Sequence, residues 1–78
     1  MTAREHWDWS IDRAMEYVEM GDAGSAMASL VQDLGNHEGT AGILTPDLQM
    51  LFMGEVMLSG AAGARRFIEG IPAPAGAS

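Results

Sequence analysis

The chain has 78 residues, with eleven Asp and Glu against four Arg and no Lys, and its formal net charge is −7. This length allows one small domain, and a hydrophobic fraction of 47% is ordinary for a folded chain. The acidic balance argues against direct binding to nucleic acid or anionic lipid, because phosphate contacts need clustered cations. The lack of cysteine excludes disulfides and thiolate metal sites.

The sequence has no pattern typical of export or of a membrane span. His6, Trp7 and Asp8 stand where a signal peptide would have an uninterrupted apolar run. The most apolar stretch, Leu48–Leu58, is shorter than the roughly 20 residues that cross a bilayer, and Glu55 interrupts it. We therefore expect a soluble, cytoplasmic protein that does not bind membranes.

A first helix is predicted from Thr2 to about Met20, because Thr2 and Glu5 have the spacing of a capping box. Its buried face is predicted from residues at helical spacing, namely Trp7, Ile11, Ala14 and Val18. The opposite side carries an acidic face, formed by Glu5, Asp8, Asp12, Glu16 and Glu19. This face is either simply solvated or a surface that meets a basic partner, and Arg13 lies off it.

A helical hairpin is predicted at Gly21-Asp22, where glycine can end one helix and aspartate can cap the next. The second helix should run from about Ala23 to Leu34, and so short a connection favours antiparallel packing. The glycine-rich segment 35–44 reads as a surface loop.

A third helix is predicted from Pro46 to Leu58, with Thr45 as its cap. Ser59-Gly60 should end it, and a weaker fourth helix should extend to about Glu69. The sequence thus predicts an all-α fold, a small bundle of three to four short helices that begins with an antiparallel hairpin. We expect one domain, 1–70, followed by a flexible tail, 71–78.

The third helix is apolar on almost every side, so it needs to be covered by other segments or by a partner. Its expected inward side consists of Leu48, Leu51, Phe52 and Leu58, while Glu55 should face solvent or a partner. Three methionines form another stripe of this helix, and with Trp9 of the first helix they make up a candidate interface: Met50, Met53, Met57 and Trp9. Methionine often fills gaps in cores, but it also occurs on adaptable binding surfaces.

The first hairpin resembles the central part of a tetratricopeptide hairpin. The likeness rests on the spacing A-x2-Y-x3-G-D-x3-A, formed by Ala14, Tyr17, Gly21-Asp22 and Ala26. It covers one hairpin, whereas a solenoid needs about three stacked units. Asp33 stands where that motif would have its next alanine.

A broader likeness extends over most of the chain, and its most specific part is the segment RRFIEG, residues 65–70. In this respect the chain is similar to small uncharacterised proteins of actinobacterial tailed phages. The other matching positions are Trp9, Arg13-Ala14, Glu16-Tyr17-Val18, Gly21-Asp22, Ala28-Ser29, Asp33-Leu34-Gly35, His37 and Thr40. The resemblance implies a phage accessory protein in the host cytoplasm, acting in host takeover, counter-defence or the virion. It transfers no functional residue.

Catalytic and metal-binding patterns are weak. His6 with Asp8 and Asp12 lacks the spacing of a good metal site, and His37-Glu38 has no partner nucleophile in the sequence. No phosphate-binding loop or dinucleotide motif is present. We therefore expect no enzyme activity, no cofactor and no metal.

The sequence favours a small acidic helical protein–protein interaction module that self-associates or docks on a host protein. The alternatives are an acidic inhibitor that mimics nucleic acid on a host or defence protein, and a minor structural component of the virion. An enzyme that uses His37 and Glu38 is the remaining class, and it predicts a concave pocket around that loop.

Overall fold

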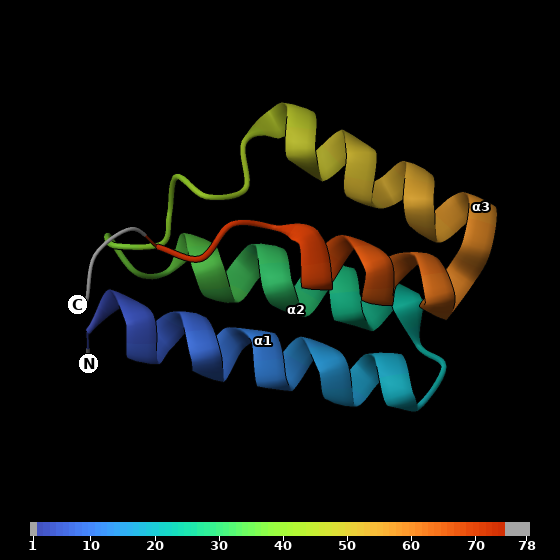
Figure 1. The fold of residues 1–78 in the computed structure, drawn as a ribbon, viewed down its shortest axis with the longest axis horizontal. Coiled ribbons are helices and arrows are strands. Elements are labelled where there is room, and N and C mark those ends of the chain that lie inside the picture. The colour runs from blue at the N-terminus through green and yellow to red at the C-terminus, as the bar shows by residue number, and fades with distance from the viewer. Residues whose placement is uncertain (1, 75–78) are drawn as a thin grey trace.

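The computed structural model describes residues 2–74, and their regular structure is entirely helical. The elements are α1 (Ala3–Glu19), α2 (Ala23–Gly35) and α3 (Pro46–Gly70). Figure 1 shows α1 and α2 side by side and antiparallel, with α3 folded back on itself beside them. The predicted all-α class is therefore confirmed, as is the hairpin with which the chain begins.

The start of α1 is fixed by the predicted capping box. The Thr2 hydroxyl accepts a hydrogen bond from the Glu5 amide at 3.1 Å, and the Thr2 amide donates to the Glu5 carboxylate at 2.8 Å. Behind this cap, Trp7, Ala14 and Val18 are buried, as their spacing predicts. Ile11 is only partly covered.

The turn between α1 and α2 depends on a left-handed residue. Gly21 has φ +78°, a conformation that costs glycine little, and Asp22 accepts a hydrogen bond from the Ser25 amide at 3.0 Å. Ala14 and Ala26 are completely buried. Two small side chains at these positions let α1 and α2 approach closely.

The loop between α2 and α3 supplies a hydrogen-bond donor to the C-terminal end of α2. The Thr40 hydroxyl is fully buried and donates to the Leu34 carbonyl at 2.7 Å. Carbonyls in the last turn of a helix have no partner within the helix, so this contact satisfies one of them. Leu44, near the end of the same loop, is buried in the core.

Helix α3 consists of two arms that meet at a sharp bend. Gly60 has φ 58° and ψ −134°, which is not helical, and the chain reverses there (Figure 1). We call residues 46–59 the first arm and residues 61–70 the second arm. The break lies at the predicted Ser59-Gly60 boundary, and the Thr45 hydroxyl caps the first arm by accepting from the Leu48 amide at 3.2 Å.

The two arms approach closely at a single glycine. A Cβ added to Gly63 would lie 2.6 Å from the carbonyl carbon of Glu55, and closer still to the carbonyl oxygen. This proximity lets the rings of Phe52 and Phe67 stack, with centroids 4.3 Å apart and planes 12° apart. Gly63 therefore determines the spacing of the arms.

One hydrophobic core joins all three helices, and Phe52, Leu30, Leu34, Ala64 and Ile68 lie at its centre. Ile71 is also buried, although the sequence assigned it to the tail that starts at this residue. The end of that predicted tail, residues 75–78, lies outside the described residues. None of the helices described combines the length and the apolarity that a membrane span requires.

Candidate functional site

The outer side of the first arm carries exposed apolar side chains. We define this apolar face as five residues that are between 50% and 85% exposed: Met50, Leu51, Met53, Met57 and Leu58. They lie on one side of the helix because the opposite side is occupied by Phe52, which is completely buried. Single exposed apolar residues are common, but a contiguous group of this kind is typical of an interaction surface.

The prediction that Leu51 and Leu58 turn inward was wrong. Leu51 is 60% exposed and Leu58 is 85% exposed, whereas Phe52 is buried and Leu48 is half-buried. Successive residues are 100° apart around a helix, so Leu51 and Leu58 both lie about 100–120° away from Phe52. Beside Phe52 lies the ring of Phe67, which comes from the second arm.

Glu55 joins the two arms on their solvent side. Arg66 donates from Nη2 to the Glu55 carboxylate at 3.0 Å and to the Ser59 hydroxyl at 3.1 Å. Both charged side chains remain partly exposed, so the pair contributes little free energy but keeps the carboxylate compensated. Glu55 therefore borders the apolar face without placing an unpaired charge on it.

Two shallow grooves flank the first arm and extend its apolar surface. One, of about 420 Å³, lies between the arms and is lined by Leu51, Phe67 and Ile71 among others. The second, of about 280 Å³, lies between α2 and the first arm, where Met27 and Met53 contribute to its wall. The first arm is thus a ridge with an apolar groove on either side.

Trp9 is half-exposed, but the structure does not bring it beside the methionines of the candidate interface. The guanidinium of Arg13 lies 4.9 Å from the Trp9 ring centroid, and the His6 ring lies 5.6 Å away. These partners hold Trp9 on α1, whereas the first arm lies on the other side of α2 and the second arm (Figure 1). Trp9 and the apolar face are therefore separate surfaces.

All five residues of the acidic face are exposed, but they differ in their contacts. Glu5 belongs to the capping box, where the hydrogen bond from the Thr2 backbone lowers the pKa of its carboxyl. Asp8 pairs with Arg4 at 3.3 Å. Within residues 2–74, no hydrogen bond or ion pair engages the remaining carboxylates, those of Asp12, Glu16 and Glu19.

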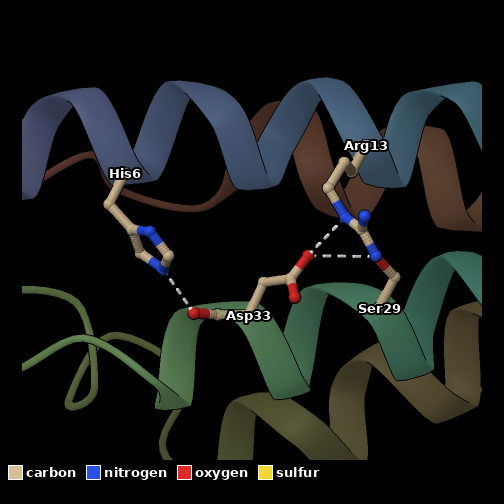
Figure 2. Close-up of polar contacts among 4 residues, drawn as sticks. All are labelled: His6, Arg13, Ser29 and Asp33. Atoms are coloured by element: carbon tan, nitrogen blue, oxygen red, sulfur yellow. Dashed lines mark hydrogen bonds and ion pairs between the residues drawn. The ribbon is translucent and has the colours of Figure 1, made fainter. Parts of the chain in front are cut away.

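A polar cluster between α1 and α2 centres on Asp33 (Figure 2). Its carboxylate accepts from Arg13 Nε at 2.9 Å and from the Ser29 hydroxyl at 3.3 Å, and its backbone carbonyl meets His6 Nε2. The Asp33 side chain is only 11% exposed, and the two contacts to its carboxylate compensate its burial. These bonds fix α1 against α2.

The sequence shows Asp33 as a departure from the tetratricopeptide pattern and as one position of the likeness to phage proteins, but not as a polar partner of α1. The signal that could have located its partner was Arg13, which stands off the acidic face and therefore points toward α2. Asp33 is thus a buried carboxylate at the position where that motif would have a small residue. Ala14 and Ala26 are completely buried.

The two histidines come together at one end of the hairpin. The rings of His6 and His37 stack with centroids 4.9 Å apart, and the Gly39 amide donates to His37 Nδ1 at 2.9 Å. These contacts hold the loop after α2 against the start of α1. Glu38 points outward and is exposed. Among the described side chains, no group of three His, Asp or Glu residues is placed to share a metal ion.

Comparison with protein-family models, with curated proteins and with solved structures gives no match for this chain. The surfaces described above are therefore the features of this chain that point to a function.

Proposed function

We propose that this protein is a small acidic helical interaction module that binds protein surfaces through the apolar face of the first arm. The observation that carries the proposal is the contiguous exposure of Met50, Leu51, Met53, Met57 and Leu58. Met50, Met53 and Met57 stand at i, i+3 and i+7, the spacing with which a helix anchors itself in an apolar groove. Methionine suits such a surface because its side chain is flexible and polarisable.

The free energy gained by burying the apolar face indicates what kind of partner can bind it stably. Burying one Met or Leu side chain fully contributes about 1.5–3 kcal/mol, so five half-exposed or more exposed side chains supply on the order of 5–10 kcal/mol. Association costs an estimated 4–15 kcal/mol in lost translational and rotational freedom. The face alone is therefore marginal, and stable binding requires a partner that buries comparable apolar surface of its own.

The biological setting belongs to the same proposal. The likeness of residues 65–70 to small phage proteins supports an accessory role in the host cytoplasm, with docking on a host protein or self-association. A minor part in the virion is compatible with the same surface, since virion assembly also proceeds through protein contacts.

A second candidate is an acidic inhibitor that occupies a nucleic-acid site, and three uncompensated carboxylates of α1 favour it: Asp12, Glu16 and Glu19. The spacing of these charges along the helix is wider than the spacing of phosphate charges along DNA. Duplex DNA carries one charge per about 1.7 Å of its axis. The acidic face has one carboxylate per three or four residues, which is roughly 5 Å of helix. We therefore rank this candidate below the apolar interface.

The proposal is tested by the solvent access of methionine methyl groups, measured by NMR with a soluble paramagnetic probe. In dilute protein, the methyls of Met50, Met53 and Met57 should be broadened by the probe as strongly as that of Met20, the C-cap residue of α1, which is 68% exposed. Raising the concentration of the chain, or adding host lysate, should protect the three first-arm methyls and leave Met20 accessible. Equal access of all four methyls under every condition would refute the proposal.

A further inference from the structure

We propose that the apolar face binds a second copy of this chain, with the two first arms antiparallel and crossing at Gly54. This inference rests on the proposed function and names the partner that the face takes. It is argued from two observations, the distribution of charge along the chain and the surroundings of Gly54, and from the pairing that a two-fold axis through this residue would produce.

Charge is distributed so that the apolar face lies on the least charged part of the molecule. Helix α3 contains three acidic residues and two arginines, a net charge of −1. Because the whole chain carries −7, the remaining −6 lies before α3, and half of it is on α1. A basic partner would find almost no countercharge beside the face. A second copy meets it with an equally neutral apolar surface, while the two acidic faces stay on the outer sides.

Gly54 lies in the middle of the apolar face, one turn after Met50 and one turn before Leu58. A Cβ added there would meet nothing within 4 Å, so no contact within the chain requires a glycine. Gly63 differs, because the backbone of Glu55 occupies the space of its missing Cβ. Glycine in a helix interior lowers helix stability, and close approach of another backbone is a common reason for it. A second helix that crosses at Gly54 supplies that reason.

Antiparallel pairing through a two-fold axis at Gly54 gives a self-complementary contact. It places Met50 opposite the partner's Leu58, and Leu51 opposite the partner's Met57. The carboxylate of Glu55 stays compensated by Arg66 of its own chain. The two copies of Asp47 then lie at opposite ends of the contact, roughly 20 Å apart along the helices. A parallel pair would instead bring both Asp47 residues and both helix N-termini together, which is repulsive.

Sedimentation equilibrium from about 1 to about 300 μM, a range that covers weak to moderate dimers, tests the pairing. The wild-type chain should pass from monomer to dimer. Met57→Glu should weaken the dimer by at least about tenfold, because it places a charge in the contact. Met20→Glu is the matched control, because Met20 has similar exposure at the C-cap of α1, and this variant should leave the dimer unchanged. Circular dichroism checks that both variants remain helical, as exposed positions should allow.

Cysteine cross-linking tests the geometry, because the chain has no cysteine of its own. The double variant Met50→Cys/Leu58→Cys should form a disulfide-linked dimer under mild oxidation, since residue 50 lies opposite the partner's residue 58 and Gly54 is left unchanged. Met50→Cys alone should not, because antiparallel arms hold the two copies of residue 50 about 12 Å apart along the axis. Efficient cross-linking of both variants would indicate parallel arms and would overturn the proposed pairing.

A chain that stays monomeric throughout the concentration range, or a dimer that Met57→Glu and Met20→Glu affect equally, would also overturn this inference. The methyl-protection experiment distinguishes failure of the homodimer from failure of the proposed function. If the first-arm methyls are protected in lysate but not by raised concentration of the chain, the face binds another protein and the homodimer is wrong. If neither condition protects them, both proposals fail.

Discussion

Substituting Gly63 tests the reasoning about how the two arms of α3 fit together. In Gly63→Ala, the new Cβ would lie 2.6 Å from the Glu55 carbonyl carbon, where about 3.4 Å or more is ordinary van der Waals contact. The obstacle is backbone and not a flexible side chain. The arms must therefore separate, and the stacked rings of Phe52 and Phe67 must lose contact.

The expected cost combines two losses with one gain. Overpacking costs typically about 1–3 kcal/mol, and a stacked aromatic pair contributes about 0.5–1.5 kcal/mol. Alanine recovers up to about 1 kcal/mol of helix propensity. The free energy of unfolding should therefore fall by roughly 2 kcal/mol, which corresponds to a Tm lower by about 8–16 °C for a domain of this size.

Thermal unfolding followed by circular dichroism, at about 1 μM to limit any contribution of association, measures this change. Gly54→Ala is the matched control, because it makes the same chemical change in the same helix where nothing lies within 4 Å. The control should raise the free energy of unfolding by about 0.5–1 kcal/mol. If Gly63→Ala is as stable as Gly54→Ala, the arms do not approach as described.

Gly60→Ala should lower the free energy of unfolding by about 1–3 kcal/mol and favour a straight α3, because residue 60 has φ and ψ values that only glycine adopts readily. Thermal melting would measure the loss of stability, and limited proteolysis would detect the separated arms. Asp33→Ala should lower the free energy of unfolding in urea by about 1–2 kcal/mol; the cost is moderate because the Arg13 guanidinium that loses its partner is half-exposed. A decrease below a few tenths of a kcal/mol would contradict the role of Asp33 in holding α1 against α2. The pKa values of Glu5 and Asp22 are lowered in the folded state because each carboxylate accepts a backbone amide. Their contribution to stability is full above the ordinary values of 4.5 and 3.8 and is lost as pH falls through the lowered folded values. Unfolding midpoints should thus drop below about pH 4, and the drop should be smaller in the double variant Glu5→Gln/Asp22→Asn.

The elements of this fold that could be predicted from sequence are those set by neighbouring residues. Thr2 and Glu5 cap α1 through atoms three residues apart, and Gly21 ends the first hairpin by a local change of backbone. Gly60 marks the bend of α3 in the same way. Each feature depends on a few consecutive residues, so composition and spacing were sufficient to find it.

The features that could not be predicted depend on which segment packs against which. Leu51 and Leu58 are as apolar as Phe52, and only the position of the second arm leaves them exposed. The contact of Asp33 with Arg13 joins residues twenty positions apart, which no local pattern encodes. Trp9 was expected to share a surface with the methionines, but the intervening helices separate them (Figure 1). Spacing gives the faces of a helix, not their neighbours.

The arrangement of two successive helical hairpins also has a consequence for how fast the chain folds. In each hairpin, a helix pairs with the segment that follows it after a turn of a few residues or a single glycine (Figure 1). Helical proteins in which contacts join nearby residues fold in microseconds to milliseconds, because little loop entropy is lost before contacts form. Both hairpins should therefore form early, and their docking should set the observed rate. Refolding in stopped flow that takes longer than about a second would contradict this.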